Sequence, residues 1–187
     1  APYAFGFTDV QARLAYDLTA RHSLSLSFLD GSSSVDRTRF RNELGFNSVM
    51  TSSFRTTLFN LGSRYVSGPH LLITNHLAWS DERGEVNNRD NTRLSDQTYN
   101  EWTWHGDASV VWSQESTLDF GGVLRRLRQS GSAKQFVYSP VLTPAVDVFH
   151  GTGDQAGAYV QQSFGSSSGR LHLTAGVRQD EHSASPL

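Results

Sequence analysis

Seven histidines are the residues of this chain best suited to bind a metal ion: His22, His70, His76, His105, His150, His172 and His182. None of them stands with carboxylates at the spacing that metal sites use, and the chain contains no cysteine. We expect His22 and His70 in short turns, and His105 and His172 on the polar face of strands. The sequence therefore predicts no metal site.

Acidic residues gather in the segment Asp81–Asp96, where their oxygens could suit calcium: Asp81, Glu82, Glu85, Asp90 and Asp96. A calcium loop needs an ordered ligand spacing around a central glycine, and this segment lacks one. Three arginines also offset much of its charge: Arg83, Arg89 and Arg93. We interpret the segment as a solvated loop.

The stretch Gly151-Thr-Gly153-Asp-Gln-Ala156 matches a loose dinucleotide-binding pattern. That chemistry requires a helix directly afterwards, because the helix N-terminus receives the pyrophosphate. The residues that follow, Ala158–Phe164, have the alternation of a strand. We expect Gly151–Ala156 to form a turn in an extracellular loop.

A basic cluster, Arg125, Arg126 and Arg128, lies where a predicted strand runs into a polar segment. It could bind an anionic ligand or the phosphates of lipopolysaccharide, or it could be a solvated strand end. No nucleophile stands beside a base at a recognisable spacing. We predict no catalytic residues, no enzyme activity and no cofactor, and the substrate-binding residues stay unknown.

Alternation of apolar and polar residues is the pattern that dominates the chain, and it is typical of half-buried strands. Over residues 102–112, Trp102, Trp104, Ala108 and Val110 occupy one face and mostly polar residues the other. Crossing a bilayer takes roughly 9–11 tilted strand residues, more than a usual globular strand. Seven further segments alternate in the same way, so we predict eight long antiparallel strands. They start near Val10, Leu24, Phe59, Leu71, Leu118, Ala158 and Leu171.

The expected connections alternate between short and long. Short turns are predicted at Thr19–His22, Ser67–His70, Ser113–Ser116 and Ser166–Gly169. Long polar loops are predicted at about Asp30–Ser53, Ser80–Thr98 and Gln129–Asp154. Short turns at one end and long loops at the other are typical of outer-membrane barrels, with the turns on the periplasmic side.

Aromatic residues precede the short turns, at Tyr16, Tyr65, Trp112 and Phe164. Such rings form girdles at both membrane–water interfaces of a barrel. Trp79, Trp102 and Trp104 lie toward the opposite strand ends and could form the second girdle.

The composition agrees with a barrel without requiring one. Apolar residues make up 37% of the 187 residues, below the roughly 45–50% of soluble domains. A net charge of −2 with intermixed signs provides no basic patch for nucleic acid. No apolar run is long enough for a transmembrane helix, and Ala1–Phe7 does not resemble a signal peptide. We expect a mature form or an internal piece of a longer protein.

Several hairpins resemble those of TonB-dependent receptors. One runs from Ala158-Tyr-Val-Gln-Gln-Ser-Phe164 through a short turn into Arg170-Leu-His-Leu-Thr-Ala-Gly-Val-Arg-Gln-Asp180, with Gln162 in place of the family's usual Asp and Gln179 in place of its Tyr. The segments 104–113 with 116–122, and 67–75, resemble two more.

The resemblance implies a bacterial outer-membrane location and a 22-stranded barrel closed by an N-terminal plug domain. Such receptors import a siderophore, vitamin or oligosaccharide with energy from the TonB system. Residues 1–187 would then be part of one barrel domain, with outer-membrane lipid around it. The plug and the usual aromatic C-terminal strand are not recognisable, and Pro186-Leu187 is not such an ending.

Two other architectures fit the same alternation. Eight strands could close by themselves into a small barrel that serves as an anchor or adhesin, if Phe5–Leu18 pairs with Arg170–Asp180. A soluble β-sandwich that binds a carbohydrate would instead cover its apolar faces with a second sheet. A propeller would need four short strands in each repeat, where we expect two long ones.

Overall fold

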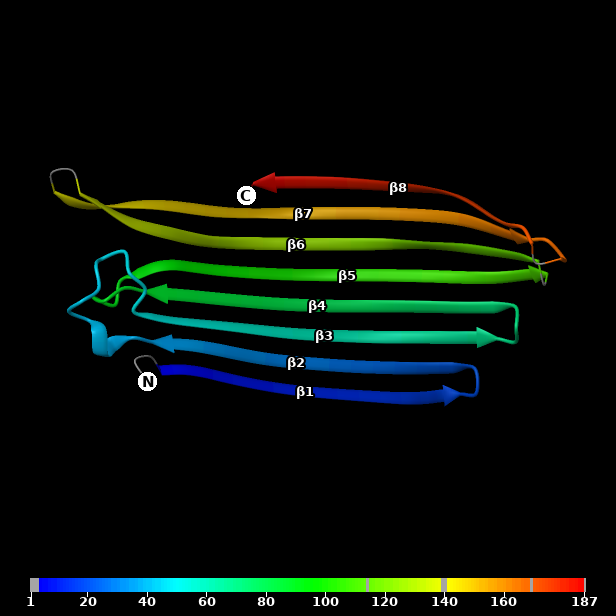
Figure 1. Ribbon diagram of the computed structural model, residues 1–187, viewed down its shortest axis with the longest axis horizontal. Helices are drawn as coiled ribbons and strands as arrows, with labels where there is room; N and C mark the ends of the chain where they lie inside the picture. Colours follow the sequence, from blue (N-terminus) through cyan, green and yellow to red (C-terminus); the bar gives the residue numbers. More distant parts are fainter. Residues whose placement is uncertain (1–3, 114, 139–140, 169, 187) are drawn as a thin grey trace.

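A computed structural model describes residues 4–113, 115–138, 141–168 and 170–186. The predicted turns Ser113–Ser116 and Ser166–Gly169 and the predicted loop Gln129–Asp154 each contain residues outside this range, as do the ends of the chain. The described part is one antiparallel sheet of eight strands in chain order (Figure 1). The strands are β1 (Ala4–Thr19), β2 (His22–Asp36), β3 (Thr51–Ser67), β4 (Leu71–Asn87), β5 (Arg93–Ser113), β6 (Ser116–Tyr138), β7 (Leu142–Gly165) and β8 (His172–Pro186).

Antiparallel strands that follow one another in the chain need only tight connections at one end. Ala20 and Arg21 join β1 to β2, and the Thr19 hydroxyl accepts hydrogen bonds from the Arg21 and His22 amides at 3.2 and 3.0 Å. Gly68 turns β3 into β4 at φ +60°, which a glycine adopts without steric cost. The predicted short turns and the eight strands are confirmed over the described residues.

The predicted long loops are wrong in extent, because most of their residues belong to strands. β2 continues to Asp36, β4 continues to Asn87, and β6 and β7 leave only a short connection between Tyr138 and Leu142. Polar pairs hold these extensions in register, such as the Arg55 guanidinium on Asp30 and Arg93 on Glu85, each at 3.1 Å. Both faces of the β2 and β4 extensions are mostly polar, so alternation could not identify them as strands. The β7 extension does alternate, with Leu142, Val146 and Val148 on one face.

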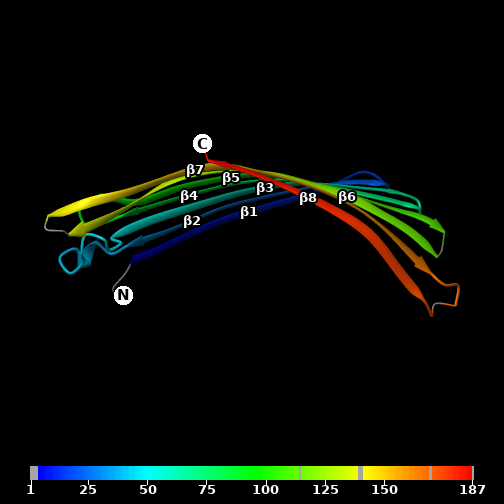
Figure 2. The same ribbon diagram turned by 90° about the horizontal axis from the view of Figure 1, so that it is seen from above.

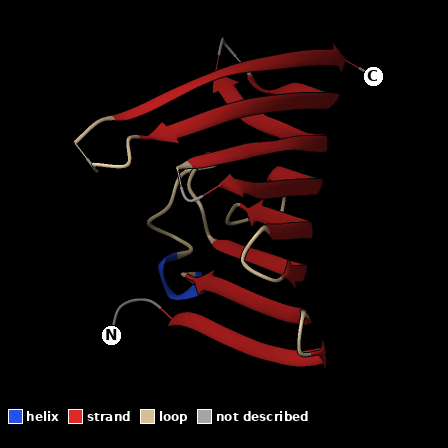
Figure 3. Ribbon diagram, turned by 90° about the vertical axis from the view of Figure 1, so that its right-hand side faces the viewer, coloured by secondary structure: helices blue, strands red, loops and turns tan. Residues whose placement is uncertain are grey.

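The sheet is a single curved layer (Figure 2), and its edge strands, β1 and β8, lie at opposite sides of it (Figures 1 and 3). Among the described residues, β1 pairs only with β2, and β8 only with β7. The expected open sheet is confirmed. The pairing of Phe5–Leu18 with Arg170–Asp180 that a self-contained barrel requires is not formed.

The side chains of this sheet cover one another very little. Its accessible surface is 12834 Å², whereas a compact soluble protein of 20.7 kDa exposes roughly 8,900 Å². The buried side chains of the described residues are Met50, Leu94 and Asn88, all at the ends of strands rather than between layers. No second layer packs on the described sheet, so the sandwich alternative is wrong for this part of the chain.

Candidate functional site: an apolar belt and a charged inner wall

The register brings most of the apolar strand residues onto one face, which we name the outer face. One row of directly paired residues crosses the sheet as Leu14, Leu26, Leu61, Leu77, Trp104, Leu124 and Ala156. The second row from it toward the short turns holds Tyr65, Ile73, Phe120 and Val160, and the row between the two holds smaller or polar residues such as Ser63 and Gly106. Many of these side chains are exposed, including Leu124 at 54%. We name this apolar band the belt.

An aromatic row borders the belt on the side away from the short turns. Phe28 pairs with Phe59, Phe59 with Trp79, and Trp79 with Trp102. The rings of Trp79 and Trp102 lie 6.1 Å apart at 44°. The three tryptophans predicted for a second girdle therefore lie together. Trp79 and Trp102 belong to the aromatic row, and Trp104 belongs to the belt row next to it. Tyr16, Tyr65 and Phe164 lie on the same face near the turns and border the belt on its other side.

The belt runs obliquely to the strands. The register carries Phe28 through the sheet to Ser183 on β8, yet the last apolar belt residue of β8 is Val177, six residues earlier. On β1 the belt instead continues to Val10, two residues beyond the partner of Phe28. From β1 to β8, the edge of the belt thus shifts by about eight residues over seven strand pairings. This shift corresponds to strands that tilt by roughly 40° from the direction perpendicular to the belt. Transmembrane barrel strands have this tilt.

The other face, which we name the inner wall, carries polar and charged side chains at the same level. Arg125 donates to the carboxylate of Glu101 at 2.6 Å and to the hydroxyl of Tyr99 at 3.2 Å. Tyr99 and Thr103 also donate to Glu101. Arg125, Tyr99 and Thr103 thus hold Glu101 in place, so this part of the wall offers hydrogen-bonding groups in fixed positions.

A second group on the inner wall surrounds Asp107. The Tyr159 hydroxyl donates to Asp107 at 2.7 Å, and His105 Nδ1 lies 3.3 Å from the other carboxylate oxygen. Arg178 donates twice to Asp180 beside it, at 2.7 and 3.0 Å. Tyr159, His105 and Arg178 line an open groove of about 370 Å³ together with Gln155 and Arg125. The groove could bind a polar small molecule through several donors and acceptors.

The structure separates the predicted basic cluster. Arg125 belongs to the inner wall, whereas Arg126 and Arg128 have the opposite parity and lie on the outer face. The cluster is therefore not one site. Arg126 pairs in register with Trp102, and its Nε lies 3.6 Å from Asp154 Oδ1.

The other predicted features lie within strands. Gly151–Ala156 is part of β7, so the expected turn at this position is wrong. The segment Asp81–Asp96 is mostly strand, with ion pairs from Arg83 to Asp81 at 2.8 Å and from Arg93 to Glu85. His105 lies on the inner wall as expected, and His172 begins β8 on the same face. In the described part of the chain no three histidine or carboxylate side chains are grouped so that they could hold a metal ion. No described helix is long and apolar enough to cross a membrane.

Sequence analysis missed a folded cluster at the strand ends opposite the short turns. The Asn88 side chain, 1% exposed, donates to the Phe46 carbonyl at 3.0 Å and accepts from the Asp90 and Thr92 amides at 2.9 Å each. Arg89 lies over the Phe46 ring at 4.4 Å. The segment 37–50 therefore folds onto the β4–β5 connection. Only the asparagines of 87–91 could have indicated it, since they favour local backbone hydrogen bonds.

Two further contacts extend this cluster to β6 and stabilise its base. Asn47 exchanges hydrogen bonds with the Phe136 backbone at 2.8 and 2.7 Å. Asp36 accepts from the Thr38 amide at 2.8 Å, and the backbone and side-chain hydrogen bonds from Thr38 lower the pKa of Asp36. Three strand pairs are thus connected at their ends by one segment.

Known proteins resemble this chain in structure, whereas no sequence comparison finds a match. No family model matches this chain, and no curated protein sequence matches it. The FpvA receptor of P. aeruginosa, solved with a heterologous ferric pyoverdine, has a TM-score of 0.74 at 13% identity over 99% of this chain and 31% of its own.

Two other receptors have the same fold. The ferric preacinetobactin receptor BauA of Acinetobacter baumannii has a TM-score of 0.64 at 10% identity over 99% of this chain and 35% of its own. The ferric yersiniabactin uptake receptor FyuA of Yersinia pestis has a TM-score of 0.63 at 10% identity over 97% and 34%. This chain spans about a third of each of these proteins. Its fold is that of part of the barrel wall of TonB-dependent outer-membrane siderophore receptors.

Proposed function

We propose that this chain is part of the barrel of a bacterial outer-membrane receptor that imports a ferric siderophore with energy from the TonB system. The observation that carries the proposal is the single sheet with an oblique apolar belt on one face and a wall of fixed polar groups on the other. In such a barrel, lipid would cover the apolar belt, and the polar interior would solvate the inner wall.

The likeness to three siderophore receptors supports a ferric chelate over the vitamin and oligosaccharide alternatives. The inner wall suits such a ligand, because siderophores present many hydroxyl, amide and carboxylate oxygens to donors such as those of Arg125, Gln155 and Arg178. Residues 1–187 would form one part of a single barrel domain. The plug, the remaining strands and the TonB contact would belong to the rest of the protein.

The test is ligand uptake by the full-length protein. The gene would be expressed in a strain that lacks its own siderophore receptors, and accumulation of radioactive iron would be measured for a panel of ferric siderophores. We expect uptake of at least one chelate, and its loss when the TonB protein is deleted. Uptake of none, with the protein correctly inserted, would contradict the proposal.

A pair of matched variants tests the role of the inner wall. Arg125→Gln removes a donor from the wall, and Arg83→Gln removes an arginine from the outer face. We expect the first to weaken chelate binding several-fold and the second to leave it unchanged. Equal binding constants in the two variants would place the ligand elsewhere in the barrel.

A further inference from the structure

One polar side chain, that of Asn75, lies inside the apolar belt. On β4 the outer face carries Ile73, Asn75, Leu77 and Trp79 in turn. At the usual rise and tilt of a barrel strand, Asn75 lies roughly 10 Å below the aromatic row that contains Trp79, in a belt about 25 Å tall. An amide would therefore face the middle of the hydrocarbon, where polar side chains are costly and mark a functional contact.

The Asn75 amide is not satisfied by its own sheet. Its side chain forms no hydrogen bond with any residue in the described ranges. Ser63, its partner in register on β3, instead lies 3.0 Å from His22 Nε2. The Asn75 side-chain oxygen lies over Gly106 of β5, where a Cβ atom would be only 2.9 Å from it. Because the side chain is only partly buried, the amide can be reached from the outer face.

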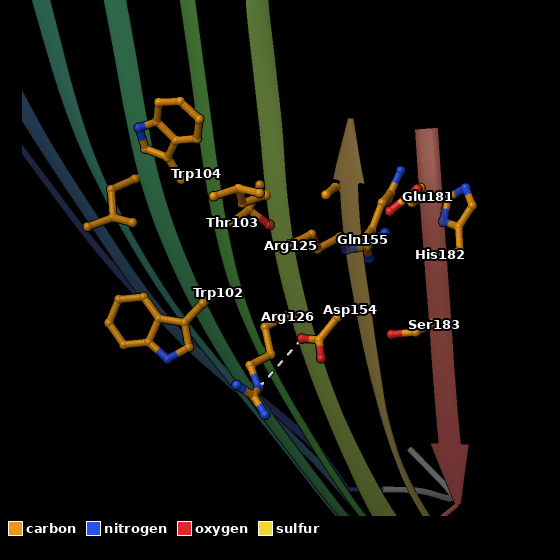
Figure 4. A pocket seen from close by; sticks show the side chains of 13 residues that line it. Trp102, Thr103, Trp104, Arg125, Arg126, Asp154, Gln155, Glu181, His182 and Ser183 are labelled. Carbon is orange, nitrogen blue, oxygen red and sulfur yellow. Dashed lines mark ion pairs between the residues drawn. The ribbon is translucent and has the colours of Figure 1, made fainter. Parts of the chain in front are cut away.

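Exposed apolar side chains lie beside this amide. Leu61, Leu77 and Trp104 form the adjacent row of the belt, and each is more than a third exposed. Trp104 projects from the same face as Trp102 and Arg126 (Figure 4). A polar group beside apolar side chains that exclude water is the arrangement found at the centre of protein interfaces.

Within the proposed barrel, nothing else reaches the outer face of β3, β4 and β5. Further strands would pair with the edges β1 and β8, and lipid tails offer neither donor nor acceptor. A second copy inserted in the same direction carries its own Asn75 at the same depth. An amide both donates and accepts hydrogen bonds, so two amides complement each other across a two-fold axis along the membrane normal.

We infer that two copies of this protein associate in the membrane through the outer faces of β3, β4 and β5. Asn75 bonds to Asn75 of the second copy, and Leu61, Leu77 and Trp104 pack around the pair. The inference rests on the proposed membrane location of the sheet and goes beyond the proposed import. Because the tilted strands of two facing copies cross, the contact is local and depends strongly on the amide pair at its centre.

The experiment measures association of the full-length protein in lipid vesicles, by energy transfer between donor-labelled and acceptor-labelled copies at several protein-to-lipid ratios. We expect a reversible dimer, and about tenfold weaker association in Asn75→Leu, which removes both amides but suits the belt. The matched control Asn100→Leu changes an amide on the same face outside the belt, in register with Asp81, and should associate like the unmodified protein. Equal association of the two leucine variants would overturn the inference.

A crosslinking arm locates the contact. In a full-length protein without other cysteines, Asn75→Cys should form a disulfide-linked dimer on mild oxidation in vesicles, whereas Asn100→Cys should stay uncrosslinked. A dimer that forms without crosslinking at position 75 would place the interface on another face and overturn the inference. A protein that inserts and imports iron as a monomer would overturn the inference alone, whereas failure to insert would overturn the membrane location as well.

Discussion

At the scale of single residues, close packing on the inner wall depends on glycines that let larger neighbours lie flat. Tyr159 reaches Asp107 by lying across Gly121, where a Cβ atom would lie 2.7 Å from Tyr159 Cε1 and 2.6 Å from the Gly106 carbonyl. Since the carbonyl belongs to the backbone, the site cannot relax by moving a side chain alone. The conformation of the Tyr159 side chain therefore requires glycine at position 121.

We predict that Gly121→Val lowers the free energy of unfolding by about 2–3 kcal/mol. The added atoms would displace Tyr159 and break its hydrogen bond to Asp107. Urea unfolding of the full-length protein in lipid vesicles measures the change. In the control Gly151→Ala, the nearest atom to the new Cβ is the Ser185 carbonyl oxygen at 3.5 Å, so we expect little effect. A valine variant as stable as this control would refute the packing argument.

At the scale of the strand, one sequence meets three environments along its length. From the short turn at Ser67, β3 crosses the belt at Tyr65, Leu61 and Phe59. Its remaining residues, as far as Thr51, form a polar extension. The outer face is apolar only over the middle part. In the proposed barrel, hydrocarbon would exclude charge there, whereas water would solvate the extension.

This gradient predicts how an added charge acts along β3. Leu61→Arg should destabilise the inserted protein by about 2–4 kcal/mol, because Leu61 lies well inside the belt. Ser53→Arg, on the same face but in the extension opposite Glu85, should change stability by less than about 1 kcal/mol. Unfolding in vesicles compares the two variants. Similar costs at both positions would contradict the assignment of the belt to lipid.

The cluster around Asn88 is the element that orders the strand ends opposite the turns. Asn88→Ala removes three hydrogen bonds from a buried site, so we predict that segment 37–50 opens more often. Limited proteolysis should cut this segment at least several-fold faster in the variant. Asn100→Ala provides a control within β5 that does not touch the cluster. An unchanged cutting rate would show that other contacts hold the segment.

At the scale of the whole molecule, the described sheet has two free edges and no core. Its stability therefore depends on contacts that other parts of the protein or the solvent make with its edges and faces. β1 and β8 each present a row of unpaired backbone groups, and a membrane offers no water to satisfy them. The remaining strands of a larger barrel would pair with both edges. We therefore propose that the sheet is part of a barrel wall rather than an independent domain.

We predict that residues 1–187 expressed alone will aggregate and fail to insert into lipid vesicles, whereas the full-length protein will insert and will migrate anomalously on unheated gels. Flotation of vesicles followed by electrophoresis distinguishes the two outcomes. A monomeric, inserted and heat-modifiable fragment would instead support a self-contained eight-stranded barrel.

The sequence by itself determined the strand segments that carry the belt. Alternation places apolar residues on one face wherever one side of a strand meets hydrocarbon, so the belt strands, their number and the short turns were predictable. The motifs around Ala158–Asp180 also indicated the receptor fold that the structural comparison confirms. These features are local, because each depends on the period of a single strand.

Only the tertiary structure decided the strand extensions, the division of Arg125 from Arg126, and the cluster around Asn88. Beyond the belt both faces of β2 and β4 are mostly polar, so no period remains in their sequence, and cross-strand pairs such as Arg55 with Asp30 keep the strands extended. Adjacent arginines look like one basic cluster until the register assigns them to opposite faces. The contacts of Asn88 and Asn47 join residues more than 40 positions apart, and such contacts follow from the register of the whole sheet.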